Sequence, residues 1–275
     1  MPARSTTARL RRYVRGLAAD PVEALLYLPE PFSERRRHAT TSVADRGWEQ
    51  RLHRLLGAPW PCPEWAEGAA VYEQIEAELA AQGLSFGRYV YGGYSDADLD
   101  LVRTMWCTVM HRRPAVVVET GVARGVTSRV VLEALERSQR GALWSVDLPH
   151  PFDRTVRAQT SAAVPTSSCL RRRWTYVAGS SRRRLRGLLR ELPSVDVFLH
   201  DSHHTPRNTM FEMTTVAKTL APDGVIVIDD VDPHQAFDEF RRSRSEFRSF
   251  VGQHADGRGL FGAMVRGPTS AVMSP

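Results

Sequence analysis

The stretch Val116–Ser128, VVVETGVARGVTS, decides how this chain folds. Its apolar run stops at the acidic residue Glu119, two glycines follow at Gly121 and Gly125, and a Thr-Ser pair then opens an amphipathic segment. This order is typical of a buried strand, a tight turn and a helix start capped by a polar side chain. Such a turn offers backbone N–H groups and an acidic acceptor to a small polar ligand.

A second apolar segment, residues 142–146, ends in Asp147. An acid at the end of the second strand of a βαβ unit is where a ribose diol is usually held. The dinucleotide fingerprint needs G-x-G-x-x-G, whereas the glycines here are spaced Gly-x-x-x-Gly and the acid Glu119 precedes them. The pattern therefore argues against a nicotinamide or flavin and favours S-adenosylmethionine. An ordinary strand, turn and helix without a ligand is the alternative.

These residues resemble the nucleoside-binding half of class I S-adenosylmethionine-dependent methyltransferases. Residues 195–205 are similar to the D-G-x-H-S/T strand end of small-molecule O-methyltransferases. Residues 220–230 resemble their L-x-P-G-G-x-x-x-x-D-D strand, with Asp223 in place of the first glycine. The most similar branch is the metal-dependent group of sugar and natural-product enzymes typified by macrocin O-methyltransferase. The likeness covers about residues 95–267 and leaves the first 85 or so without a counterpart.

The resemblance implies a set of cofactor contacts at the strand ends. Glu119 would contact the methionine amino group or the ribose, Asp147 the ribose diol and Ser180 the adenine edge. The full set of expected cofactor-binding residues is Glu119, Thr120, Gly121, Gly125, Thr127, Ser128, Asp147, Gly179, Ser180 and Asp201. Catalysis would be mostly alignment of the two reactants, with acid–base help from Asp201 or His204.

Three acids fall at the ends of two neighbouring predicted strands. Asp201, Asp229 and Asp230 offer the hard oxygen ligands that Mg²⁺ accepts while it keeps waters for a substrate. In the family that this chain resembles, the equivalent acids bind such a metal, which orients two substrate hydroxyls. Alternatively, Asp229 or Asp230 caps the next helix or touches only the methionine part of the cofactor.

Four histidines lie in or just after the same two predicted strands. His200 lies within a strand, where a histidine is more often packed than catalytic, and His203 is expected on a turn surface. His204 matches the family's motif histidine, and it either accepts a proton or braces the loop. His234 is expected to be a solvated residue at a helix start, with reach into the pocket as the alternative.

Composition bounds the setting of the protein. A chain of 275 residues with 42% apolar content predicts one main α/β domain. No window is apolar for the roughly 18 residues that a membrane span needs, and the Arg-rich first 20 residues lack the apolar core of a secretory signal. Cys62, Cys107 and Cys169 are far apart in sequence and odd in number, so neither a disulfide framework nor a zinc set is expected. These features predict a cytoplasmic protein.

The net charge of +6 invites a nucleic-acid partner. Arginine triplets begin at Arg35, Arg171 and Arg182, yet the chain holds a single lysine, Lys218. An excess of arginine over lysine is common in chains coded by GC-rich genes. The stretch 182–190 also fits the solvated face of a helix, and no interleaving of aromatic and basic residues of the stacking kind accompanies the triplets. Nucleic acid is therefore not the expected partner.

The order of elements predicts the architecture. Helices are expected over 6–28, 44–57 and 69–82 and from a Ser95 cap to about His111, with strands at 115–120, 143–147, 174–178, 195–200 and 224–229 and an antiparallel pair near 248–254 and 259–266. The predicted fold is a Rossmann-like, doubly wound α/β domain, in which a mostly parallel seven-stranded sheet ends in an antiparallel strand. Residues 1–94 form an N-terminal helical extension, and 95–275 form the S-adenosylmethionine-binding domain. The loop around Tyr89, Tyr91 and Tyr94 either closes over a ligand or packs the extension onto the sheet.

The sequence thus predicts an O-methyltransferase that uses S-adenosylmethionine, assisted by Mg²⁺, on a hydroxyl of a small molecule. The expected acceptor is a sugar or a natural-product intermediate, met by the first 90 residues and the segment His150–Arg173. Two other classes stay open: a nucleic-acid or protein methyltransferase, and a methyltransferase-like binding subunit without activity. The sequence also leaves open whether the chain forms a homo-oligomer.

Overall fold

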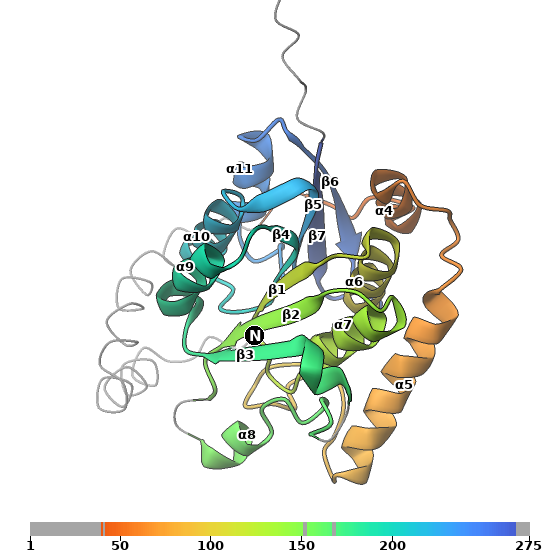
Figure 1. Cartoon of the computed structure of the whole chain (residues 1–275), viewed down its shortest axis with the longest axis vertical. Coiled ribbons are helices and arrows are strands. Elements are labelled where there is room, and N and C mark those ends of the chain that lie inside the picture. Colours follow the sequence, from red (N-terminus) through yellow and green to blue (C-terminus); the bar gives the residue numbers. More distant parts are fainter. Residues whose placement is uncertain (1–39, 41, 151–152, 167–168, 268–275) are drawn as a thin grey trace, which may run out of the picture.

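The computed structural model describes residues 40, 42–150, 153–166 and 169–267, and it contains one seven-stranded sheet. Its strands are β1 (Val116–Thr120), β2 (Ala142–Asp147), β3 (Trp174–Ala178), β4 (Val195–His200), β5 (Leu220–Ile228), β6 (Phe247–Gln253) and β7 (Leu260–Arg266). Their order in the sheet is β3-β2-β1-β4-β5-β7-β6 (Figure 1). The first five are parallel, and β7 runs antiparallel to both of its neighbours. This is the predicted fold class, and the strand positions confirm it.

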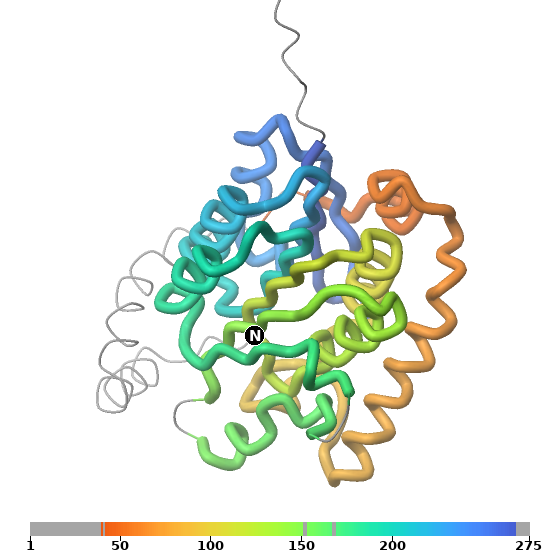
Figure 2. Tube along the Cα trace, in the orientation of Figure 1, coloured from red at the N-terminus to blue at the C-terminus, as the bar shows by residue number. Residues whose placement is uncertain are grey.

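Helices cover both faces of the sheet (Figure 1). The elements are α4 (Trp48–Leu56), α5 (Trp65–Ala81), α6 (Leu99–Arg112), α7 (Val126–Arg137), α8 (Arg154–Ala158), the 3-10 helix η2 (Cys169–Arg173), α9 (Ser181–Glu191), α10 (Pro206–Val216) and α11 (Ala236–Arg242). Helices α4, α6 and α7 lie on one face, and α9, α10 and α11 lie on the other. Helix α5 packs outside α6 and α7, as the trace in Figure 2 shows.

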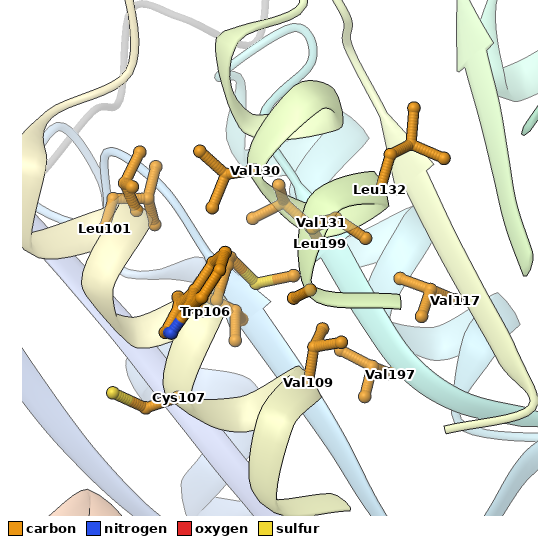
Figure 3. Close-up of a cluster of buried hydrophobic side chains, with 14 of the residues drawn as sticks. Leu101, Trp106, Cys107, Val109, Val117, Val130, Val131, Leu132, Val197 and Leu199 are labelled. Atoms are coloured by element: carbon orange, nitrogen blue, oxygen red, sulfur yellow. The ribbon is translucent and has the colours of Figure 1, made fainter. Parts of the chain in front are cut away.

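The strand residues alternate between two apolar layers. Val117, Val197 and Leu199 join the layer that contains α6 and α7, where Trp106 is fully buried (Figure 3). Val118 and Phe198 point to the opposite layer, with α9, α10 and α11. Because both faces of the central strands β1 and β4 are covered, their sequences read as almost continuous apolar runs, whereas β3 is partly exposed. The next residues along β1, Glu119 and Thr120, inherit this alternation and enter opposite layers.

Two helix starts differ from the prediction. The N-cap of α6 is Asp98, whose carboxylate accepts from the backbone N–H of Asp100. Ser95 instead accepts a hydrogen bond from the backbone N–H of Tyr89, so it is committed to the preceding loop. The N-cap of α7 is Gly125, in the left-handed conformation, and no described side chain caps this helix. A Thr-Ser cap was therefore the wrong prediction for α7.

The described part of the N-terminal extension belongs to the same core as the sheet. Trp48 of α4 stacks on Phe250 of β6 and meets Phe261 of β7 edge-on. Gly68 of α5 lies so close to Trp106 that a Cβ atom there would come within 2.7 Å of the indole. The expected helix over 6–28 lies outside the described residues. Among the described residues, no helix has the length and apolar character needed to cross a membrane.

Candidate active site

The glycine turn after β1 lies directly against the end of β4. Gly121 has a φ of +87°, and a Cβ atom on it would fall 2.0 Å from the carbonyl oxygen of Asp201. Gly125 also has a positive φ, +82°. Only glycine permits both the conformation and the close approach at Gly121. The turn therefore brings the first strand end and Asp201 into one site.

Glu119 is buried below this turn rather than open beside it. One of its carboxylate oxygens accepts from the hydroxyls of Ser128 at 2.6 Å and Ser145 at 2.7 Å, and the side chain is almost fully excluded from solvent. Burial raises the pKa of Glu119 to about 8, although the two serine hydroxyls oppose the rise. Ser128 thus serves Glu119 and joins α7 to β1. The backbone N–H groups that open α7 have no side-chain cap.

Thr120 points into the other layer, where a polar network is buried. Its hydroxyl donates to Glu212 of α10, which also accepts from Ser202 and forms a 2.6 Å contact with Nδ1 of His200. Glu212 is fully buried, and although burial opposes ionisation, the charge and hydrogen bond of His200 lower its pKa to about 2. His200 is therefore a packed and satisfied histidine, as the sequence predicted.

Asp147 ends β2 beside the same turn. Its two oxygens accept from the backbone N–H of Val122 at 3.1 Å and from the hydroxyl of Tyr176 at 3.0 Å. Burial raises its pKa, and these hydrogen bonds partly offset the effect. The chain continues at the end of β3 through Gly179, whose N–H donates to the Asp147 carbonyl, and Ser180, the N-cap of α9. The predicted nucleoside-binding residues thus lie at the carboxyl ends of the parallel strands.

Three carboxylates converge at the ends of β4 and β5, as predicted. Ligand atoms of Asp201, His204 and Asp229 lie within 4.8 Å of one another, as do those of Asp229, Asp230 and His254. Burial, and the charges of Asp230 and Asp201, raise the pKa of Asp229 to about 6. Gln235, not Asp229 or Asp230, is the N-cap of the following helix α11. We call these five residues the acid cluster.

His204 lies between two of the acids. Its Nδ1 is 2.8 Å from Asp230, and its Nε2 is 3.4 Å from Asp201. Burial alone would lower its pKa, but the hydrogen bonds and charges of Asp201 and Asp230 raise it well above the usual value. In turn, His204 holds the pKa of Asp230 at about 2, against the effect of burial.

His254, in the connection between β6 and β7, is a member of the acid cluster that the sequence did not suggest. Its Nε2 lies 2.8 Å from Asp229. Burial opposes protonation, yet the hydrogen bond and charge of Asp229 raise its pKa to about 9. Nothing in the local sequence indicates this pairing. It depends on how β7 pairs with both β6 and β5 and so brings the β6–β7 connection to the end of β5.

His234 corrects one prediction. It was expected to be solvated at a helix start, but it is only 2% exposed, and its Nε2 lies 3.4 Å from the Thr209 hydroxyl. Thr209 in turn meets Nε2 of His200 at 3.0 Å, so His234 extends the buried network under β4. His203 lies on an exposed turn, as predicted.

The tyrosine loop lies next to the glycine turn and is tied to it. Arg124 of the turn makes a buried ion pair with Asp96, which also accepts from the backbone N–H of Gly87. Tyr91 is buried, with its hydroxyl 2.9 Å from Thr160, whereas Tyr89 and Tyr94 are more than half exposed. Neither Arg124 nor Asp96 stood out in the sequence.

Comparison with known proteins agrees with this geometry. Residues 118–231 match a family model described as a methyltransferase domain. The O-methyltransferase from Bacillus cereus, solved in complex with SAH, is similar with a TM-score of 0.55 and 17% identity, over 72% of this chain and 90% of that one. TomG from Streptomyces achromogenes, an O-methyltransferase involved in tomaymycin synthesis and solved with SAM, has a TM-score of 0.54 and 15% identity, over 72% and 89%. No curated protein sequence matches the chain.

The matched segment begins in β1 and ends just after β5, so it contains the glycine turn and most of the acid cluster. The strand order, with an antiparallel β7, is shared with the solved methyltransferases. Residues 118–231 therefore form a methyltransferase domain, and the chain has the Rossmann-like fold of the solved methyltransferases.

Proposed function

We propose that this methyltransferase acts on oxygen: it transfers the methyl group of S-adenosylmethionine to a hydroxyl of a small molecule, a sugar or natural-product intermediate, with a Mg²⁺ ion at the acid cluster. The observation that carries the proposal is the placement of Asp201. Its backbone lies against Gly121 of the glycine turn, while its side chain belongs to the acid cluster. A methyl donor at the turn and a hydroxyl at the acids would therefore be neighbours.

The turn suits the cofactor in its donors and its shape. The uncapped start of α7 presents backbone N–H groups, and Gly121 leaves no side chain above them. Asp147 would hold the ribose diol, since each carboxylate oxygen can accept a further hydrogen bond. Glu119, bound to Ser128 and Ser145, would act by holding the turn in place. When bound, S-adenosylmethionine would supply a methyl group on a sulfonium, open to in-line attack by an acceptor oxygen at the methyl carbon.

The acid cluster suits a hard divalent ion. Asp201, Asp229 and Asp230 supply carboxylate oxygens from two adjacent strand ends, the ligands that Mg²⁺ prefers. These three would hold the ion, which when bound supplies positive charge that favours the ionised form of an acceptor hydroxyl. His254 would keep Asp229 oriented through its 2.8 Å contact.

His204 fits the role of a positioning residue better than that of a base. Both of its ring nitrogens face carboxylates, at 2.8 Å and 3.4 Å, so neither is directed at open space. We assign it to orienting Asp230 and Asp201. In this proposal the acceptor oxygen forms the new bond to the methyl carbon, the carbon–sulfur bond breaks with its electron pair left on sulfur, and the hydroxyl proton passes to Asp201.

A groove beside His254 offers a place for the acceptor. It has a volume of about 740 Å³ and is lined by residues 42–48, Asp100, 253–255, Gly257 and Leu260. It therefore lies between the N-terminal extension and the β6–β7 connection. His254, which lines the groove, also contacts Asp229 of the acid cluster. This placement supports an acceptor held in part by the extension.

The test combines binding and turnover. Calorimetric titration with S-adenosylhomocysteine should show binding, and a screen of sugar and natural-product alcohols should find methyl transfer that EDTA abolishes and Mg²⁺ restores, with Mn²⁺ as a substitute. Asp229→Asn should lower the rate more than the affinity for S-adenosylhomocysteine. Asp223→Asn is the matched control, because Asp223 lies toward the opposite end of β5. Turnover of an alcohol acceptor that resists the chelator would sink the metal assignment, and transfer only to nitrogen or nucleic acid would sink the O-methyl assignment.

A nucleic-acid acceptor is the alternative that the positive charge left open. Two arginines of the triplet that begins at Arg171 are engaged within the fold. Arg173 pairs with Glu136 at 2.6 Å, and Arg171 lies over the Trp174 ring and donates to two backbone carbonyls. These contacts favour a structural role for that triplet. The triplet that begins at Arg35 lies outside the described residues.

A further inference from the structure

Two histidines and a cysteine from distant parts of the sequence meet near the start of the sheet, apart from the acid cluster. His53 lies in α4, Cys62 lies in the loop after it, and His111 lies near the end of α6. The two imidazoles and the sulfur each offer one ligand atom, and these atoms lie within 4.8 Å of one another. Cys107, one turn earlier in α6, interacts with the same thiol. The cysteines were expected to be too far apart for a metal set, but the packing of α4 on α6 brings two of them together.

His53 is held in the form that a metal ligand requires. Its Nδ1 lies 2.8 Å from the Glu49 carbonyl, which can only accept, so Nδ1 carries the proton and Nε2 carries a lone pair. The side chain is 1% exposed, and no hydrogen bond to Nε2 forms among the described residues. A metal-bound histidine commonly donates its other ring N–H to a backbone carbonyl in this way. The buried lone pair of His53 therefore carries the free-energy cost of a polar atom without a hydrogen-bond partner.

Three separations among Cys62, His111 and the nearby Glu64 match the edges of a tetrahedron around zinc. Sγ of Cys62 lies 3.4 Å from Nε2 of His111, and Oε2 of Glu64 lies 3.6 Å from each of them. With Zn–S of about 2.3 Å and Zn–N of about 2.0–2.1 Å, neighbouring ligand atoms of a tetrahedral site are about 3.3–3.7 Å apart. The three atoms are thus already spaced as ligands.

The chemistry of the ligands also points to zinc. The thiolate is the form that binds metals. One thiolate with imidazoles and a carboxylate favours zinc over Mg²⁺, which prefers oxygen ligands alone.

We propose that His53, Cys62 and His111 bind one Zn²⁺ ion, with the Glu64 carboxylate as the fourth ligand. The site is structural: it fastens α4 and the loop after it to α6. His111 lies near the end of α6, shortly before β1 begins, whereas the acid cluster lies where β4 and β5 end. The two sites therefore lie at opposite ends of the parallel strands. All four ligands come from protein, which leaves no open position for a substrate.

The test is the metal content of the full-length, untagged protein, grown with zinc and passed through gel filtration. We expect about one Zn²⁺ per chain, lost in Cys62→Ser and in His111→Gln. Asp229→Asn should keep the zinc, which separates this site from the acid cluster, and Cys169→Ser should keep it as the control for an exposed cysteine. Cys107→Ser should keep it as well, because Cys107 is not a ligand.

A second measurement does not depend on how the variants fold. The wild-type protein, stripped with a chelator and refilled with Co²⁺, should show the intense visible bands of a tetrahedral site and a thiolate-to-metal charge-transfer band. A folded wild-type protein that neither carries zinc nor retains it when added would overturn the proposal. So would a Co²⁺ spectrum without a thiolate band, or a mass showing that Cys62 and Cys107 have formed a disulfide.

Discussion

The guanidinium of Arg124 and the carboxylate of Asp96 form a buried ion pair that ties the glycine turn to the tyrosine loop. Nε of Arg124 lies 2.9 Å from Oδ1 of Asp96, a second contact joins the other oxygen, and the two side chains are 1% and 2% exposed. Gly87 donates its N–H to the same carboxylate. The glycine turn and the tyrosine loop are therefore coupled through one carboxylate.

Asp96→Ala should destabilise the protein by about 3–5 kcal/mol, because it leaves the Arg124 charge buried without a partner. Urea unfolding followed by circular dichroism measures the loss. Glu67→Ala removes an exposed partner of Arg137 and should change stability by less than about 1 kcal/mol. Equal effects of the two substitutions would show that the Arg124 pair contributes no more than a surface contact.

Gly121→Ala should damage both stability and cofactor binding. Its Cβ atom would lie 2.0 Å from the Asp201 carbonyl, at a φ that side chains rarely adopt, so the turn or the end of β4 must move. We expect a loss of more than about 1 kcal/mol in the free energy of unfolding. Gly187→Ala, inside α9 with open space around it, should instead stabilise by about 0.5–1 kcal/mol. A harmless Gly121→Ala would contradict the close approach.

Glu119 should make the protein less stable as the pH rises. Its pKa is about 8 in the folded state and about 4.5 in an unfolded chain, so between these values the folded state binds a proton that the unfolded state has released. Its contribution is complete below about pH 4.5 and is lost as the pH approaches 8. Glu119→Gln should remove this part of the pH dependence, since glutamine stays neutral. Melting temperatures of both proteins across pH 5–9 measure the difference, and parallel curves would exclude Glu119 as the cause.

Asp147→Ala should weaken S-adenosylhomocysteine binding by about 1–3 kcal/mol, because ribose hydroxyls would lose a charged acceptor. Tyr176→Phe is the matched control: it deletes the hydroxyl that donates to Asp147 but keeps the carboxylate, so its effect should be smaller. Calorimetry on both folded variants gives the comparison. Unchanged affinity in Asp147→Ala would mean that another group holds the ribose.

Local pattern was enough to predict the fold. Each parallel strand ends at or just before a glycine or an acid, and the central strands are apolar runs buried on both faces, so the strand positions could be read to within a few residues. Helix starts were less predictable because capping is a choice among neighbours: Asp98, rather than Ser95, reaches the first free N–H groups of α6. Gly125 is the N-cap of α7, and Ser128, inside the first turn of the helix, donates to Glu119 instead.

By itself, the sequence determined the order of strands and helices, the glycine turn and the three acids at the strand ends, since these depend on residues close together in the chain. Only the tertiary structure decided which side chains partner them. His254 reaches Asp229 because β6 and β7 return along the sheet, Asp96 reaches Arg124 because the tyrosine loop lies beside the turn, and His53, Cys62 and His111 meet because α4 packs on α6. Contacts between residues 25 or more positions apart are set by packing, which no local pattern encodes.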